Sequence, residues 1–142
     1  MGEMIRDAKL SDLSVLTELS KVLGYEKSDE EMLSNLIEVL ADENILLVAE
    51  IDGTVVGYVE GSIYRSILVP RGVRVMGIAV LPDFQDKGIG GELLTALENQ
   101  VRDRGFAMIS LTSGEARHLA HEFYLKHGYA ADHLQMKFAK WL

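Results

Sequence analysis

The sequence predicts an α+β domain built on a mixed β-sheet. Three observations carry this prediction: β-rich and amphipathic helical runs alternate along the 142 residues, a hairpin signal joins two of the strands, and a strand-helix-strand unit follows it. The hydrophobic fraction of 48% and the charged fraction of 25% are typical of a globular chain. We therefore expect one domain over residues 1–142, with no repeat or linker inside it.

The first segments are expected to be a strand and two helices. Met4–Ala8 has the pattern of a short strand. Ser11 and Asp12 supply an N-cap for a helix with an apolar stripe: Leu13, Leu16, Leu19 and Leu23. The second helix begins with the capping box Ser28-x-x-Glu31. Its apolar residues should share one face: Met32, Leu33, Leu36, Ile37 and Leu40.

Three strands are expected next. Asn44–Ile51 and Thr54–Tyr64 are β-rich and are joined by Asp52-Gly53, a strong hairpin signal. Val73–Leu81 is mostly apolar, as a strand buried on both faces must be, and it ends at Pro82.

The remainder of the chain predicts two helices and two further strands. A helix over Gly91–Arg104 leads to a strand over Phe106–Thr112, which should lie parallel to Val73–Leu81 because a helical crossover joins them. A last helix is expected over Glu115–His127, with Leu119 and Phe123 facing inward. The tail, residues 130–142, alternates in polarity and predicts a terminal strand or hairpin.

Three methionines are expected to fill the core: Met4, Met32 and Met76.

Composition excludes several classes of function. The chain has no cysteine, which removes disulfides, thiolate metal ligands and a cysteinyl acyl-enzyme. Its formal net charge of −8 argues against nucleic acid as a partner. No segment has the apolar length that crosses a bilayer, and no signal-peptide pattern opens the chain, so we expect a soluble, cytoplasmic protein without a membrane partner.

The charge is divided unevenly along the chain. Residues 1–60 hold fourteen acids and four bases, a balance of −10, whereas residues 61–142 hold eight acids and ten bases, a balance of +2. A solvated acidic surface accounts for this as well as a binding role does. In the binding interpretation, the first half meets a cationic molecule and the second an anionic one.

The turn after Val73–Leu81 has the composition of an anion-binding site. Gly88, Gly90 and Gly91 open the next helix. Glycines let main-chain N–H groups approach a ligand, and a helix N-terminus adds about half a positive charge. The segment is neither a Walker A loop nor a dinucleotide-binding fingerprint, whose third glycine would fall at Leu93. Alone, these glycines are equally compatible with a plain turn and helix cap.

Two motifs at this point decide between the alternatives. The first is Gln85-x-x-Gly88-x-Gly90, after the strand end Ile78-Ala79-Val80-Leu81-Pro82. The second is Arg117-x-x-Ala120-His121-x-Phe123-Tyr124-x-x-x-Gly128-Tyr129. Together they resemble the pyrophosphate motif and the fourth helix of the GNAT superfamily of N-acetyltransferases. The resemblance covers the whole chain and implies the GNAT acyl-CoA N-acyltransferase fold, a central mixed sheet flanked by about four helices.

The resemblance implies acetyl-coenzyme A (acetyl-CoA) as donor and a primary amine as acceptor. The residues it assigns to the donor are Ile78, Ala79, Val80, Gln85, Asp86, Lys87, Gly88, Ile89, Gly90, Gly91, Arg117 and Tyr124. In such relatives the loop amides bind the pyrophosphate. Main-chain groups of Ile78 and Val80 would bind the pantetheine arm where the parallel strands splay apart, and the Val80 N–H would face the thioester oxygen. Lys87 would add a positive charge. Arg117 would contact a CoA phosphate or an anionic acceptor, or lie on the helix surface.

The same resemblance implies that Tyr124 is the general acid. A phenol with a pKa of about 10 can protonate the departing thiolate. From the residues alone, a packed tyrosine beside Leu119 and Phe123 is the other interpretation.

The general base stays open at this level. An alkylamine must lose a proton before it attacks, so a carboxylate or an ordered water is expected. Some relatives carry a glutamate on the strand before the loop, but here that position is Gly77. Glu60 is the remaining catalytic candidate, followed by Glu50, and both are also compatible with surface carboxylates.

We therefore expect direct acetyl transfer, in a ternary complex, to a small cationic or amino-bearing metabolite. The alternatives are a non-catalytic acyl-CoA-binding sensor on the same fold and a protein or peptide amine acetyltransferase. The resemblance also allows a homodimer. His118 and His121 have a spacing that a metal could use, but no third ligand is near in the sequence, so no metal is expected. We expect His121 to pack or to form a local bond, and His118 to be exposed.

Overall fold

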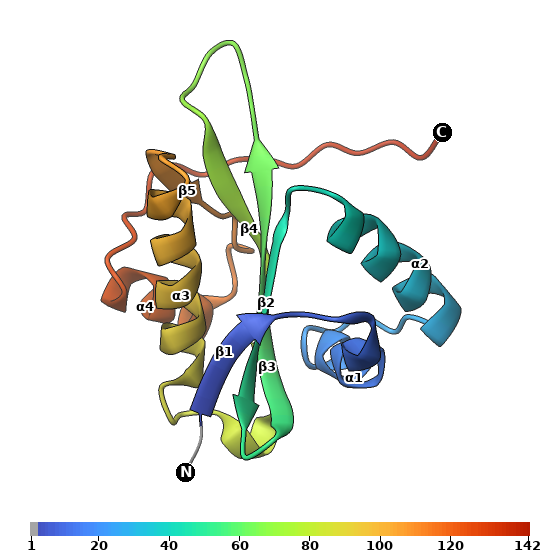
Figure 1. Cartoon of the computed structure of the whole chain (residues 1–142). Helices are drawn as coiled ribbons and strands as arrows, with labels where there is room; N and C mark the ends of the chain where they lie inside the picture. Colours follow the sequence, from blue (N-terminus) through green and yellow to red (C-terminus); the bar gives the residue numbers. More distant parts are fainter. Residues whose placement is uncertain (1–2) are drawn as a thin grey trace. The chain divides into compact units, whose positions relative to one another are not determined.

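The computed structural model describes residues 3–142. The chain forms two compact units, Met1–Leu111 and Thr112–Leu142, each with its own internal contacts. The elements of the first unit, in chain order, are β1 (Glu3–Asp7), η1 (Leu10–Asp12), α1 (Leu13–Val22), α2 (Asp29–Ala41), β2 (Ile45–Ile51), β3 (Thr54–Tyr64), β4 (Gly72–Val80), η2 (Pro82–Phe84), α3 (Ile89–Asp103) and β5 (Met108–Ser110) (Figure 1). The second unit contains α4 (His118–Lys126).

The five strands form one mixed sheet, as the sequence predicts, and their order in it is β1-β2-β3-β4-β5. Neighbours are antiparallel from β1 to β4, and β4 and β5 are parallel, which confirms the crossover through α3. The β2–β3 hairpin turns at Asp52 and Gly53, whose φ angles of 50° and 84° suit a tight type I′ turn. β5 is shorter than the predicted strand over Phe106–Thr112.

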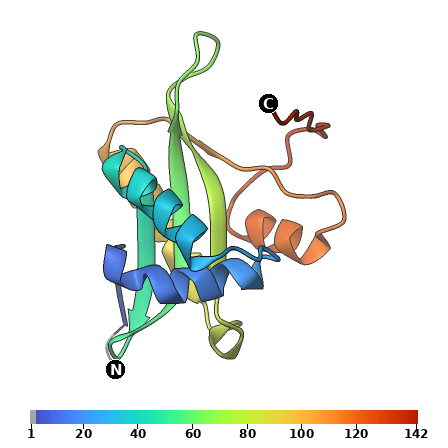
Figure 2. The same ribbon diagram turned by 90° about the vertical axis from the view of Figure 1, so that its right-hand side faces the viewer.

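Helices cover both faces of this sheet. α1 packs against β3 and β4 on one face, and α3 packs against β2, β3 and β4 on the other (Figures 1 and 2). The core beneath α1 and α2 consists of Ala8, Leu16, Leu19, Leu36, Leu46, Val48, Val55 and Ala79. On the opposite face, α3 buries its apolar stripe completely: Leu93, Leu94 and Leu97. The sheet is therefore a rigid platform between two hydrophobic layers.

Helix α2 begins as predicted but buries less than predicted. The Ser28 hydroxyl accepts from the Glu31 N–H at 3.1 Å, which confirms the capping box. Only Leu36 of its expected apolar face is buried; Leu33, Ile37 and Leu40 are 38–51% exposed. The reason is its position, because α2 has most of its contacts with α1 and η1. Only Leu36, with Met32 and Val39 beside it, reaches the core that the sheet shares. Figure 2 shows α1 and α2 on the same face of the sheet.

Two of the three methionines predicted for the core are exposed. Met76 is 58% exposed because β4 carries a bulge: Glu60 pairs with Gly77 and Gly61 with Val75, which leaves Met76 without a partner. Met4 is 50% exposed on the edge strand β1. Met32 does pack against the core, as expected.

The second unit departs most from the predictions. Its helix begins at His118 rather than Glu115, and Leu119 is 82% exposed instead of inward. Residues 130–142 form no strand or hairpin, so that prediction is wrong. A strand needs a neighbour to satisfy its main-chain hydrogen bonds, and this unit holds none. Across residues 3–142, no helix combines the length and apolar character that crossing a membrane requires.

Candidate active site

The end of β4 presents a main-chain edge that β5 does not cover. β5 pairs with β4 only from Gly72 to Arg74. The Leu81 N–H donates to the Val56 carbonyl at 2.8 Å, toward β3. Main-chain groups alternate in direction along a strand, so those of Ile78 and Val80 point to the opposite edge, and Ala79 between them points to β3. No described strand pairs with this edge beyond Arg74.

The loop from Gln85 to Gly91 exposes a row of main-chain amides. Gly88 caps α3 in a left-handed conformation with φ 84°, and Asp86 also has a positive φ of 61°. Among the described residues, the amides of residues 86–91 donate to no main-chain carbonyl; the first helical bond runs from Glu92 to Gly88. These amides, Ile89, Gly90 and Gly91 included, lie at the positive end of a 15-residue helix. The geometry suits an anion.

Two side chains of this loop have local partners. Gln85 donates from Nε2 to the Val80 carbonyl at 2.9 Å, which ties the loop to the end of β4. Lys87 lies with Nζ 5.5 Å from the centre of the Phe84 ring. Gln85 therefore braces the loop in this structure, and Lys87 places a positive charge beside the free amides.

On the α1 face of the sheet, Glu60 and Tyr58 lie next to Gly77. Glu60 pairs with Gly77, and Tyr58 pairs with Ala79. Burial raises the pKa of Glu60. Burial also raises the pKa of Tyr58 to about 12, with the charge of Glu60 and then Tyr25 adding to the shift. Of the described residues, none forms a hydrogen bond or ion pair with the Glu60 carboxylate.

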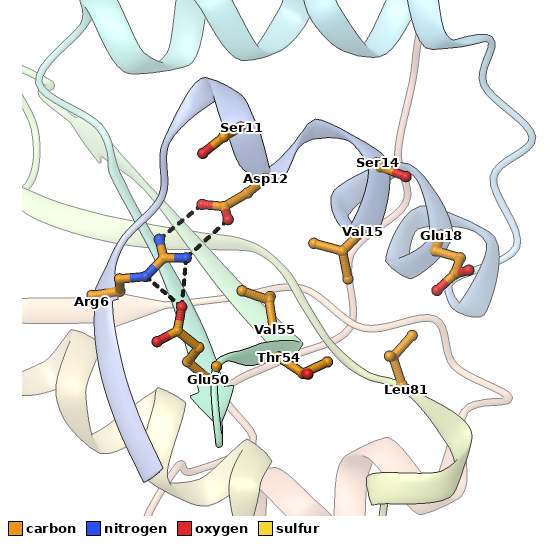
Figure 3. A pocket seen from close by; sticks show the side chains of 11 residues that line it. Arg6, Ser11, Asp12, Ser14, Val15, Glu18, Glu50, Thr54, Val55 and Leu81 are labelled. Atoms are coloured by element: carbon orange, nitrogen blue, oxygen red, sulfur yellow. Dashed lines mark hydrogen bonds and ion pairs between the residues drawn. The ribbon is translucent and has the colours of Figure 1, made fainter. Parts of the chain in front are cut away.

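Glu50, the second carboxylate considered as a base, is occupied elsewhere. Arg6 donates to Glu50 Oε1 at 3.0 and 3.1 Å and to both oxygens of Asp12 at 2.9 Å (Figure 3). This cluster borders a cleft of about 410 Å³ near the β2–β3 hairpin, lined also by Ser14, Val15, Glu18 and Leu81 among others (Figure 3). The sequence carries no local signal for it, because Arg6 and Glu50 lie 44 residues apart.

Tyr124 and Arg117 belong to the second unit. Tyr124 is half-buried, and its burial raises the pKa of the phenol while the Arg117 charge lowers it. Its ring contacts Phe123 and Tyr129 edge to face, with centroids 5.4 and 6.0 Å apart. Arg117 is exposed and lies at the N-cap position of α4, where its side chain forms no capping hydrogen bond.

The histidines of this unit have local roles. His121 Nε2 lies 2.8 Å from the Gly114 carbonyl, so the predicted local bond is confirmed. His118 is exposed, also as predicted. Among residues 3–142, no group of three histidine or carboxylate side chains has an arrangement that could hold a metal ion.

Tyr58 is the residue that sequence reasoning missed. Its proximity to Gly77 depends on the β3–β4 register, which the bulge at Met76 sets. The available signals were the alternation of Thr54–Tyr64, which places Tyr58 and Glu60 on one face, and a glycine at the position where relatives carry an acid.

Comparison with known proteins places these features in a family. The model of the acetyltransferase (GNAT) family matches residues 12–129. The uncharacterised N-acetyltransferase YhfO of Bacillus subtilis is 26% identical over 140 residues, covering 90% of each chain. The aminoalkylphosphonate N-acetyltransferase of Salmonella typhimurium is 33% identical over 61 residues, which cover 43% of this chain and 40% of that one.

Partial matches extend to much longer proteins. The tRNA(Met) cytidine acetyltransferase TmcA 2 of Saccharolobus solfataricus is 36% identical over 67 residues, or 47% of this chain. The match spans only 9% of that protein.

Solved structures agree on the fold, although their identities are low. The aminoglycoside acetyltransferase AAC(6')-Iy, bound to a bisubstrate analogue of CoA and acetylneamine, superposes with a TM-score of 0.88 at 20% identity, over all of both chains. A transcriptional regulator from Bacillus halodurans gives a TM-score of 0.84 at 21% identity, over 98% of this chain and 100% of that one. With the family model matched across both units, the chain belongs to the GNAT family of acetyltransferases.

Proposed function

We propose that this enzyme transfers the acetyl group of acetyl-CoA directly to a primary amine, within a ternary complex, and that the acceptor is a small cationic or amino-bearing metabolite. The observation that carries the proposal is the uncovered edge of β4 followed by the free amides of residues 86–91. An open strand edge that leads directly into an anion-binding loop can bind an extended ligand that ends in phosphates.

Different residues of the first unit bind different parts of acetyl-CoA. The amides from Asp86 to Gly91 bind the pyrophosphate, and Lys87 adds a positive charge. Ile78 and Val80 bind the amide groups of the pantetheine arm as an added strand would. The Val80 N–H donates to the thioester oxygen, where negative charge develops. Gln85 keeps this geometry by holding the loop to the Val80 carbonyl.

The chemistry removes two protons from the acceptor ammonium and delivers one to the leaving thiolate. Acetyl-CoA supplies an activated acyl carbon with a thiolate leaving group. Glu60, directly or through a water, takes the first proton and leaves a free amine. The amine attacks the acyl carbon, and the new C–N bond forms as the C–S bond breaks; the nitrogen releases its second proton to water, and Tyr124 protonates the thiolate. Burial suits Glu60 to this role, because a base with a raised pKa holds a proton more readily than an ordinary carboxylate does.

The nature of the acceptor is supported by charge and by similarity. Residues 1–60 carry a balance of −10, and the helices α1 and α2 with their connection bear exposed acids: Glu18, Glu26, Asp29, Glu30 and Glu38. Relatives and solved neighbours named above act on aminoalkylphosphonates and aminoglycosides, both of which offer amines. We extend the proposal to residues 1–142 as one catalytic domain, since the family match crosses both units.

The test is an activity screen with a binding measurement beside it. CoA thiol release is followed with polyamines, aminoglycosides, aminophosphonates and peptide amines, and products are identified by a mass increase of one acetyl group. Calorimetry measures acetyl-CoA binding in parallel. Turnover with a small amine supports the proposal. Tight acetyl-CoA binding with no turnover favours the sensor alternative, and neither binding nor turnover rules out both.

A further inference from the structure

A side chain at position 77 would collide with the Tyr58 hydroxyl. A Cβ built on Gly77 would lie 2.6 Å from Tyr58 Oη, well inside van der Waals contact, and 3.4 Å from Cζ, an ordinary contact distance. The backbone itself does not require glycine here, because Gly77 is absent from the residues with positive φ. The phenol therefore lies across β4, in the space where a side chain at position 77 would begin.

The Tyr58 hydroxyl and the Glu60 carboxylate are both free to meet a ligand. Among the described residues, neither group has a hydrogen-bond partner. Ser113 Oγ is the one described side-chain polar atom that is both fully enclosed and unpartnered, so Tyr58 Oη and the Glu60 oxygens keep contact with solvent. Both groups are therefore half-buried, open to solvent and unoccupied by other described side chains, as groups that contact a ligand must be.

Aromatic and apolar groups complete the surroundings. Leu23 Cδ1 would lie 3.6 Å from a Cβ at Gly77, so the end of α1 reaches this point of the sheet. Tyr25 follows on the α1–α2 connection, near enough to raise the pKa of Tyr58, and its side chain is exposed. Figure 2 shows this connection crossing the face of the sheet. A hydroxyl, a carboxylate and tyrosine rings together favour an alkylammonium group.

We propose that Tyr58 and Glu60 form the acceptor subsite, with Glu60 binding the ammonium group and the Tyr58 hydroxyl aligning the amine, and that Gly77 keeps the space for that hydroxyl. The proposal rests on the acetyltransferase function above and narrows its acceptor. Amines that carry a carboxylate or phosphonate beside the reacting nitrogen are poor acceptors, because Glu60 and the acidic helices α1 and α2 repel them. Polyamines and aminoglycoside-like amines are the favoured class.

The first experiment compares Tyr58→Phe, Gly77→Ala and the double variant with Tyr64→Phe as a matched control. Tyr64 lies on the same strand with its ring 5.4 Å from the Arg74 guanidinium, an arrangement that phenylalanine keeps. We expect Tyr58→Phe to raise the acceptor KM about tenfold or more, the effect of one lost hydrogen bond to a charged group, with the acetyl-CoA KM unchanged.

Gly77→Ala should raise the acceptor KM by a similar factor, because the new Cβ displaces the Tyr58 phenol. The double variant should be no worse than Tyr58→Phe and should recover the melting temperature that Gly77→Ala loses, since the clash involves the hydroxyl. An acceptor KM for Tyr58→Phe equal to that of Tyr64→Phe overturns the proposal.

A second experiment separates this proposal from the catalytic one. Spermidine and neamine are titrated by calorimetry into the CoA-saturated protein, which requires no turnover. Weaker binding by Tyr58→Phe and by Glu60→Gln, but not by Tyr64→Phe, supports the subsite even if acetylation is not observed. Undiminished binding in both variants, or no binding of either amine by the unaltered protein, overturns it. Turnover with unaltered KM values in both variants overturns the subsite while leaving the acetyltransferase function intact.

Discussion

Arg6 holds Asp12 through two parallel hydrogen bonds of 2.9 Å, from Nη1 to Oδ2 and from Nη2 to Oδ1. The Asp12 side chain is only 7% exposed, and it also accepts the Lys9 N–H at 2.8 Å. This pair joins β1 to the start of α1, and Glu50 extends it to β2. It is the most enclosed charge cluster among the described ion pairs.

Removing the Asp12 charge should destabilise the protein. The Arg6 guanidinium, and after it the Lys9 N–H, hold the pKa of Asp12 below its usual range despite burial. Asp12→Asn leaves Arg6 half-paired and should cost about 3 kcal/mol in chemical denaturation. A lowered pKa contributes stability that is present above the ordinary pKa of aspartate and is lost as pH falls through the folded value. The free energy of unfolding should therefore fall less on acidification in Asp12→Asn than in the unaltered protein. The same decrease in both proteins would contradict this.

Gly88 and Gly53 form a matched pair for testing the loop. Both have φ 84° and open space where a Cβ would stand, so alanine strains the backbone equally at each. Each variant should lose about 1–2 kcal/mol of stability. Only Gly88→Ala should also weaken CoA binding, by about threefold to tenfold, because it tilts the amides at the start of α3. Equal CoA affinities of Gly88→Ala and Gly53→Ala in calorimetry would show that the loop does not bind CoA.

Tyr124→Phe tests the general acid. The substitution keeps the ring contacts with Phe123 and Tyr129 and removes only the hydroxyl. We expect kcat to fall about 100-fold, with little change in either KM, since a general acid acts in the transition state. Tyr129→Phe serves as the control. Equal kcat values for the two variants would assign Tyr124 to packing.

Glu60 predicts opposite pH effects on activity and stability. Because burial raises its pKa, the acid limb of kcat/KM should lie above the range of an ordinary glutamate, and Glu60→Gln should lower kcat/KM about 100-fold and remove that limb. A raised carboxyl pKa contributes stability at low pH that is lost as pH rises through the folded value. The unaltered protein should thus be less stable than Glu60→Gln at neutral pH and approach it in acid. If the difference in stability between the two proteins did not change with pH, the pKa of Glu60 would be that of a solvent-exposed glutamate.

Salt should change the acceptor KM of a polycation more than that of a monoamine. If the acidic first half attracts a polycation, the acceptor KM should rise with ionic strength for spermidine but stay nearly constant for a monoamine. The measurement is steady-state kinetics from low to moderate salt. A spermidine KM that ignores salt would make the charge balance of −10 over residues 1–60 a solvated surface.

Local sequence signals predicted the local structures well. The capping box at Ser28, the turn at Asp52-Gly53 and the glycine-led start of α3 all depend on residues a few positions apart, and the structure confirms each. The parallel pairing of β4 and β5 follows from the crossover rule, which depends on chain handedness rather than on detailed contacts.

Predictions that depended on a distant partner did less well. The tail over residues 130–142 has strand-like alternation but forms no strand, because no neighbour in its unit supplies hydrogen bonds. Met76 is apolar in an apolar run, yet the bulge turns it outward. Apolar character records a preference for burial, and the packing partner decides whether burial occurs.

The sequence by itself determined the family, the order of the elements and the loop from Gln85 to Gly91, because these are carried by residues close together in the chain. Only the tertiary structure decided which carboxylates are available: Glu50 is bound by Arg6, whereas Glu60 lies beside Tyr58 with no partner among residues 3–142. It also explained Gly77, whose missing side chain makes room for a hydroxyl from the neighbouring strand. The physical reason is strand register, which brings residues far apart in sequence within contact distance and which no short motif encodes.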